Sequence, residues 1–230
     1  MNRSVGPEGY SQKVANFFPR WVNKLPLKIG IGFLVVAALI VVGVWYYLTP
    51  KYGRVGYSPV QPVPFSHKVH VDQLGMDCRY CHSNVERSQH STVPTTQTCM
   101  NCHGQIQKDN PKLAPVHESW ASGKPIEWIK VHKLSDFAYF DHSAHVNRGV
   151  SCVSCHGQVN QMDRVTAQKP LSMAWCLECH RAPENYLRPR DQVFNLNWKP
   201  EPGTTQLEIG TQLKKQRGVN PPTNCAACHR

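Results

Sequence analysis

The sequence predicts a chain of mostly irregular structure, with short helices wrapped round several attached groups, plus one N-terminal transmembrane helix. Three observations predict this fold class. A Cys-x-x-Cys-His motif occurs five times. A Phe-x-His-x-x-His motif occurs twice, each time ahead of two of those five. Residues 29–48 carry no charge, and that length spans the hydrocarbon core of a bilayer.

The C-x-x-C-H motif is the attachment site of a c-type haem. Residues i and i+3 of a helical turn share one face, so both thiols can form thioethers with one haem, and the following histidine can reach its iron. The motifs use all ten cysteines: Cys78 and Cys81, Cys99 and Cys102, Cys152 and Cys155, Cys176 and Cys179, and Cys225 and Cys228. The proximal iron ligands are then His82, His103, His156, His180 and His229. The sequence therefore predicts a multihaem cytochrome c with five covalently bound haem c groups.

A single C-x-x-C pair is also compatible with half of a zinc site or with a redox disulfide. Zinc needs four ligands per site and gives no reason for a histidine to follow every pair. Only 12 of the 230 residues are histidine. The probability that a histidine follows all five C-x-x-C pairs by chance is therefore on the order of 10⁻⁷ to 10⁻⁶. Haem attachment accounts for all five motifs at once.

The composition indicates that the haems themselves form the core. The cysteine-bearing part of the chain offers about 34 residues per haem, too few to build an apolar core around each. A chain with 18 prolines and 15 glycines fits such an irregular wrapping. A net charge of +11 is compatible with nucleic-acid binding. The two propionates on each of five haems, however, add a charge of about −10, which would almost neutralise the protein. We therefore expect many Arg and Lys side chains to pair with propionates, and we expect no nucleic-acid partner.

The first part of the chain predicts a membrane anchor. Residues 1–28 are basic, with aromatic residues at roughly helical spacing, and suggest a cytoplasmic or interfacial segment; a disordered basic tail is the alternative. Residues 29–48 are expected to form the transmembrane helix, which ends in an aromatic belt of Trp45, Tyr46 and Tyr47. A cleaved signal peptide would have a shorter apolar region and a cleavage site of small residues.

The orientation follows from two arguments that agree. The basic flank places the N-terminus in the cytoplasm. Haem c is attached outside the cytoplasm, which requires the remainder of the chain to lie in the periplasm. We expect a single-pass protein of the bacterial inner membrane, with residues 49–64 as a linker. Since thioethers consume the cysteines, no disulfide framework is expected.

The F-x-H-x-x-H motif covers residues 65–70 and again 140–145. Each copy precedes two haem motifs, which indicates a duplicated dihaem module, over residues 65–135 and 136–182. Residues 183–230 are expected to wrap the modules and to carry the fifth haem at one end of the row. Because i and i+3 project from one helical face, one motif can supply the second axial ligand to two adjacent haems. The predicted distal ligands are His67, His70, His142 and His145.

One haem still lacks a distal ligand. His132 and Met173 are the main candidates, and the sequence does not decide between them. A buried methionine beside a haem is often a packing residue rather than a ligand. His90 and His117 are expected at the surface or as partners of propionates.

The paired F-x-H-x-x-H and C-x-x-C-H units resemble class III multihaem cytochromes c of the c3/c7 type. The resemblance becomes more specific with residues 16–20, the single anchor, the five haem motifs and residues 173–181. With these, the chain looks like the pentahaem membrane-anchored cytochrome c subunit of bacterial alternative complex III. That resemblance implies an electron-transfer subunit of a quinol-oxidising respiratory complex. Its implied partners are an iron–sulfur/molybdopterin-like subunit, integral quinol-site subunits, and a monohaem cytochrome c subunit, soluble carrier or terminal oxidase as acceptor.

Two other functions stay open at this point. A multihaem reductase needs a five-coordinate iron, and at least six distal candidates for five haems argue against one. A membrane-anchored quinol dehydrogenase of the tetrahaem type also has one N-terminal anchor, but it has four haems that begin close to the membrane. We therefore expect electron transfer, with no catalytic residue in the chain itself.

Overall fold

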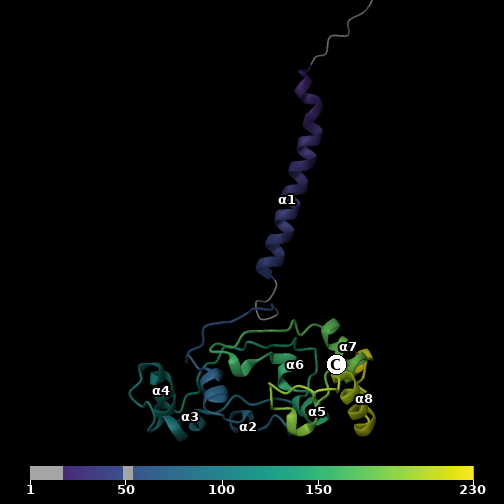
Figure 1. The fold of residues 1–230 in the computed structure, drawn as a ribbon. Helices are drawn as coiled ribbons and strands as arrows, with labels where there is room; N and C mark the ends of the chain where they lie inside the picture. The colour runs from purple at the N-terminus through teal and green to yellow at the C-terminus, as the bar shows by residue number, and fades with distance from the viewer. Residues whose placement is uncertain (1–17, 49–53, 230) are drawn as a thin grey trace, which may run out of the picture. The chain divides into compact units, whose positions relative to one another are not determined.

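The computed structural model describes residues 18–48 and 54–229. The chain divides into two compact units, Met1–Thr49 and Pro50–Arg230. Figure 1 shows the first as one long helix and the second as short helices joined by irregular chain. Residues 1–17, which make up most of the predicted basic segment, lie outside the described residues, as does part of the predicted linker.

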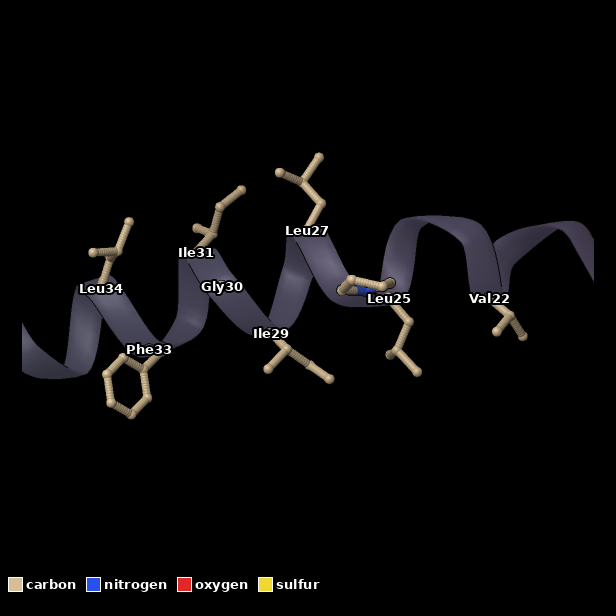
Figure 2. Close-up of a pocket in the computed structure, with 9 residues that line it drawn as sticks. Val22, Leu25, Leu27, Ile29, Gly30, Ile31, Phe33 and Leu34 are labelled. Carbon is tan, nitrogen blue, oxygen red and sulfur yellow. The ribbon is translucent and has the colours of Figure 1, made fainter.

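The first unit consists of the short helix η1 (Arg20–Lys24) and helix α1 (Leu25–Leu48). Its apolar side chains point in all directions: Figure 2 shows Leu25 and Ile29 on one side of the helix and Leu27 and Ile31 on the other. No described side chain of α1 is buried. A helix that is apolar all round is stable where its surroundings are apolar. It is thus a candidate membrane span, although a signal sequence satisfies the same criteria of length and composition.

The second unit has no strand among its described residues. Its two isolated bridges join Ala138 to His229 and Val150 to Leu187. Its helices are η3 (Lys68–Gln73), α2 (Cys78–Cys81), α3 (Thr96–His103), η4 (Pro111–Leu113), α4 (Ala114–Ser122), α5 (His142–Arg148), α6 (Cys152–His156), η5 (Val159–Gln161), α7 (Met173–Arg181), η6 (Pro183–Asn185), η7 (Arg190–Gln192), α8 (Gln206–Arg217) and α9 (Cys225–Cys228). The unit is helical and irregular, as the sequence predicted.

Each C-x-x-C pair lies on a helix, in α2, α3, α6, α7 and α9. Three of these helices begin at a capping side chain: Asp77, Ser172 and Asn224 each accept a hydrogen bond from a backbone N–H of the first turn. A cap satisfies one of the N–H groups that have no partner within the helix. These polar residues therefore start the turn that places both thiols on one face.

The second F-x-H-x-x-H motif forms a short helix with defined ends. The Asp141 side chain accepts a hydrogen bond from the Ala144 N–H at the start of α5. Gly149 ends the helix at a φ of 97°. A Cβ at this position would lie 2.5 Å from the Arg188 carbonyl oxygen, so the turn requires glycine.

The protein's own core is small. Among the described residues, ten hydrophobic side chains and Pro183 are buried, and one cluster joins Val85, Val146 and Val193, with Phe194 packed against it. The Ser151 hydroxyl, also buried, donates a hydrogen bond to the Val193 carbonyl oxygen at 2.6 Å. So few buried apolar residues are a small core for a unit of this length. This fits the expectation that attached groups complete the core.

The C-terminal wrap contains one regular helix that the sequence alone did not predict. Helix α8 starts with a capping box between Thr205 and Glu208. It packs on η6, where Gly210 is buried and Lys214 forms an ion pair of 2.8 Å with Glu184. Helix α8 thereby ties the chain after the fourth haem motif to the chain before the fifth.

Candidate haem sites

Histidines of the two motif types face one another in pairs. The ring centroids are 6.2 Å apart for His70 and His103, 6.5 Å for His142 and His156, and 6.1 Å for His145 and His180. A metal–imidazole bond is about 2 Å long, so two imidazoles that bind one metal ion from opposite sides have centroids about 6 Å apart. Each pair joins a predicted distal ligand to a predicted proximal ligand. The spacing suits the two axial ligands of one six-coordinate iron.

His67 and His82 form a fourth neighbouring pair. Burial, and then repulsion from His82 and His70, lower the pKa of His67 to about 4. His67 and His82 occupy the same places in the first module as His142 and His156 in the second. The neutral imidazole that burial favours is the form that binds a metal ion.

The phenylalanine ring of each F-x-H-x-x-H motif contacts both histidine rings of the same motif. The Phe65 ring stacks on His70 with centroids 4.4 Å apart and meets His67 edge-on at 4.9 Å. The Phe140 ring has the same relation to its own pair, at 4.5 Å and 4.8 Å. The sequence duplication is therefore also a duplication of side-chain geometry, and each phenylalanine fixes the spacing of two ligands.

Seven of the nine histidines in these motifs direct Nδ1 at a backbone carbonyl oxygen: His70, His82, His103, His142, His145, His180 and His229. A carbonyl oxygen only accepts, so Nδ1 must carry the hydrogen and Nε2 must keep its lone pair. Metal-ligating histidines commonly donate their second ring N–H in this way, which fixes the tautomer and the ring orientation. The protein thus presents Nε2 in the form that binds iron.

The other two motif histidines are His67 and His156. The Nδ1 atom of His67 is buried and has no hydrogen-bond partner in the described part of the chain. The ring of His156 lies 4.3 Å from that of His132, at 80°. Burial, followed by repulsion from His132 and His142, lowers the pKa of His156 to about 3.

The two candidates for the fifth distal ligand have different surroundings. His132 lies against His156 of the third motif, too close for both rings to bind one iron from opposite sides. Its Nε2 atom is buried without a partner among the described residues. Met173 is the first residue of α7 and is 65% exposed. It lies one turn before Cys176, whose thiol pKa is raised by burial and then by the nearby Cys228 of the fifth motif.

His90 and His117 differ in their exposure to solvent. His90 is exposed, as expected for a surface residue. His117 lies on α4, which packs against α3 and the second haem motif, and its buried Nε2 has no partner within the described chain. A lone histidine outside any repeated motif offers no sequence signal for such a position. A buried polar atom of this kind normally has a partner, which a propionate near the second site would supply.

The donor set fits haem c better than zinc. Within residues 18–48 and 54–229, no three His, Cys, Asp or Glu side chains gather around one point. The thiols instead come in pairs on helical turns, and the imidazoles come in facing pairs. Paired thiols suit thioether attachment and facing imidazoles suit axial ligation, whereas a structural zinc site needs four donors in a tetrahedron.

Comparison with known families decides the class. The profile of the family described as cytochrome c7 and related cytochrome c matches residues 63–119 and 138–230. The chain belongs to this family. It is therefore a multihaem electron-transfer cytochrome with covalently bound c-type haem.

Several named proteins are similar to this cytochrome. The multiheme cytochrome c subunit of menaquinone reductase from Nitratidesulfovibrio vulgaris is 30% identical over 176 residues, which cover 67% of this chain and 81% of that protein. The acrylate reductase cytochrome subunit of Shewanella woodyi is 26% identical over 111 residues, 48% of this chain and 68% of that one. The nine-heme cytochrome c of Desulfovibrio desulfuricans is 25% identical over 172 residues, 71% and 44% of the two chains. Two of these names are cytochrome subunits of reductases, consistent with electron transfer rather than catalysis in this chain.

Proposed function

We propose that this cytochrome is the electron-transfer subunit of a quinol-oxidising respiratory membrane complex of the alternative complex III type. The observation that carries the proposal is the set of facing histidine pairs about 6 Å apart. An iron with both axial positions filled has no open position for a substrate, which suits an electron carrier and argues against a reductase.

In this proposal the chain binds five haem c groups through the five C-x-x-C-H motifs. When bound, each haem supplies a one-electron redox site. The first copy of F-x-H-x-x-H gives His67 to the haem of His82 and His70 to that of His103. The second copy gives His142 to the haem of His156 and His145 to that of His180. The Nδ1 hydrogen bonds orient these rings and keep each Nε2 free of hydrogen.

Met173 is the proposed distal ligand of the fifth haem, opposite His229. Its position one turn before Cys176, whose thiol neighbours Cys228, supports this assignment. The contact between His132 and His156 supports a place for His132 in the surroundings of the third haem instead. A methionine ligand raises the potential of a haem, so the fifth haem would be a high-potential member of the set.

Helix α1 is the proposed anchor in the bacterial inner membrane, with a cytoplasmic N-terminus and the haem domain in the periplasm. A lipid bilayer would surround the apolar side chains that no described segment covers. The partners would be an iron–sulfur subunit as electron donor, integral subunits with a quinol site, and a monohaem cytochrome c, soluble carrier or oxidase as acceptor. The menaquinone in the name of one relative supports a quinone-linked complex.

That same name favours a second candidate, in which electrons flow from the cytochrome toward menaquinone. Purification of the native complex in mild detergent distinguishes the alternatives. We expect an iron–sulfur subunit and integral membrane subunits to co-purify with the full-length chain, and quinol to reduce its haems only in their presence. Net electron flow from reduced cytochrome to a menaquinone analogue would favour the second candidate. Quinol oxidation by the isolated chain would contradict both and indicate a tetrahaem-type dehydrogenase.

A further inference from the structure

The first and second haem motifs are neighbours in space. The side-chain amide of Asn101, inside the second motif, donates a hydrogen bond to the Tyr80 hydroxyl, inside the first, at 3.2 Å. This hydrogen bond joins the two sites directly.

The first and third motifs are joined by the chain that follows the first. His142, the proposed distal ligand at the third site, donates from Nδ1 to the Gln89 carbonyl oxygen at 2.9 Å. Gln89 lies seven residues after His82 of the first motif. The Ser143 N–H, on the same helix as His142, donates a hydrogen bond to the Ser88 carbonyl oxygen at 3.2 Å. The first site therefore has the second site as one neighbour and the third as another.

The third and fourth sites share a phenylalanine. The Phe140 ring contacts His142 of the third site and His145 of the fourth. His142 and His145 also lie on one helix, α5, so the third and fourth sites share this helix.

The fourth site in turn meets the fifth. His180 donates from Nδ1 to the Pro222 carbonyl oxygen at 2.7 Å, and Pro222 lies three residues before Cys225. Three of the four links thus have a hydrogen bond of their own. The link between the third and fourth sites has the shared Phe140 ring instead.

Exposure of the thiols follows the same order. Two of the ten cysteines are exposed, Cys102 of the second motif and Cys225 of the fifth. The third motif follows directly on the buried Ser151, and neither of its cysteines is exposed. In a row of five sites, the two end sites are expected to be more exposed than the middle site, which agrees with these exposures.

We infer that the five haem sites form one unbranched row in the order second, first, third, fourth and fifth motif. Figure 1 shows the labelled motif helices α3, α2, α6 and α7 in this order across the haem domain. The inference rests on the proposed function in that electrons follow this row. Other redox proteins then exchange electrons with the second and fifth sites, and the third site is the internal relay.

Distances between spin labels test the order without changing any ligand. All ten native cysteines are in haem motifs, so an added cysteine is the only free thiol of the holoprotein. The exposed residues Gln105, Gln158 and Thr223, beside the second, third and fifth motifs, are replaced by cysteine in pairs and carry gadolinium labels. In the full-length reduced protein, we expect the distance between labels at 105 and 223 to exceed both other distances. A shorter distance between 105 and 223 than between 105 and 158 overturns the row.

Photoreduction tests the path itself. A ruthenium photosensitiser at position 105 or 223 injects one electron into the oxidised holoprotein. Variants His70→Met and His142→Met, each combined with Met173→His to remove the methionine proposed at the fifth site, mark the second and third sites by the absorption band of a methionine-ligated ferric haem. From position 105 we expect the second site to respond before the third, and from position 223 the reverse. If the second and third sites are reduced in the same order from both positions, the inference is contradicted. If a variant loses haem, the label distances alone test the row.

These outcomes are independent of whether the complex oxidises quinol. Absence of the expected partner subunits on purification, together with label distances in the inferred order, would refute the proposed complex and keep the row. Co-purification of the expected partner subunits, together with label distances in a different order, would refute the row alone.

Discussion

Replacing the buried Gly210 should separate helix α8 from the segment that follows the fourth haem motif. A Cβ at position 210 would overlap the Glu184 carbonyl oxygen and lie 2.6 Å from the carbonyl carbon and 2.9 Å from the Cα of Glu184. Favourable contacts between carbon atoms are about 3.5–4.0 Å, so the two segments must move apart by about 1 Å. Since the obstacle is backbone, no side-chain rotation relieves it.

The expected cost of Gly210→Ala follows from three contributions. Overpacking of a tight contact costs about 3 kcal/mol at the upper end of the usual range. The ion pair between Lys214 and Glu184, whose side chains are 37% and 22% exposed, contributes less than about 1 kcal/mol and would be weakened. Alanine is about 1 kcal/mol better than glycine inside a helix, which offsets part of the loss. The net destabilisation is about 2 kcal/mol, or about 4–8 °C in Tm for a domain of this size.

The assay is thermal unfolding of the full-length holoprotein in detergent, followed by far-ultraviolet circular dichroism and by haem absorption. Thr211→Ala is the matched control, because Thr211 is the next residue of α8, is exposed, and tests helix propensity without the clash. We expect the control to keep or slightly raise Tm. An unchanged or higher Tm for Gly210→Ala would show that α8 does not rest on η6 as described.

Three further predictions address ligands and pH. His70→Ala should open one iron, so that each chain binds one carbon monoxide and shows one high-spin haem, whereas the exposed His90→Ala should bind none; no binding in the first variant would remove His70 as a ligand. Met173→His should lower one of the five potentials in a redox titration, and an unchanged titration would remove Met173 as a ligand. The hydrogen bond from Lys214 lowers the pKa of Glu184 below its ordinary value. The carboxylate therefore stabilises the fold above that ordinary value, and this stabilisation is lost as pH falls through the lowered pKa. Glu184→Gln should therefore remove a small acid-dependent step from Tm measured between neutral and acid pH, and an unaltered profile would show that the pair contributes nothing.

Local features of the candidate sites were predictable from the sequence. The C-x-x-C spacing predicts a helical turn because two thioethers require both thiols on one face, and all five pairs lie on helices. The i and i+3 histidines of the F-x-H-x-x-H motif likewise predict a shared helical face. Phe65 and Phe140 stand two residues before the first histidine of each motif, and each contacts both of its histidines.

Non-local features were not predictable. Spacing along the chain does not say which distal histidine faces which proximal one, because that depends on how loops bring modules together. The contact between His132 and His156 and the burial of His117 depend on such long-range packing and have no motif. Helix α8 did carry a local signal, since Thr205 and Glu208 have the spacing of a capping box, but the prolines around it indicated an extended wrap instead.

The attached cofactors are the central claim, and intact-mass spectrometry of the full-length chain from native membranes tests it most directly. Thioethers survive denaturation, so haem c stays with the polypeptide when its fold is lost. We expect the mass of the chain plus five haem equivalents. A mass with no haem, or with only one or two equivalents in a fully folded preparation, would contradict the ligand assignments and the row of redox sites.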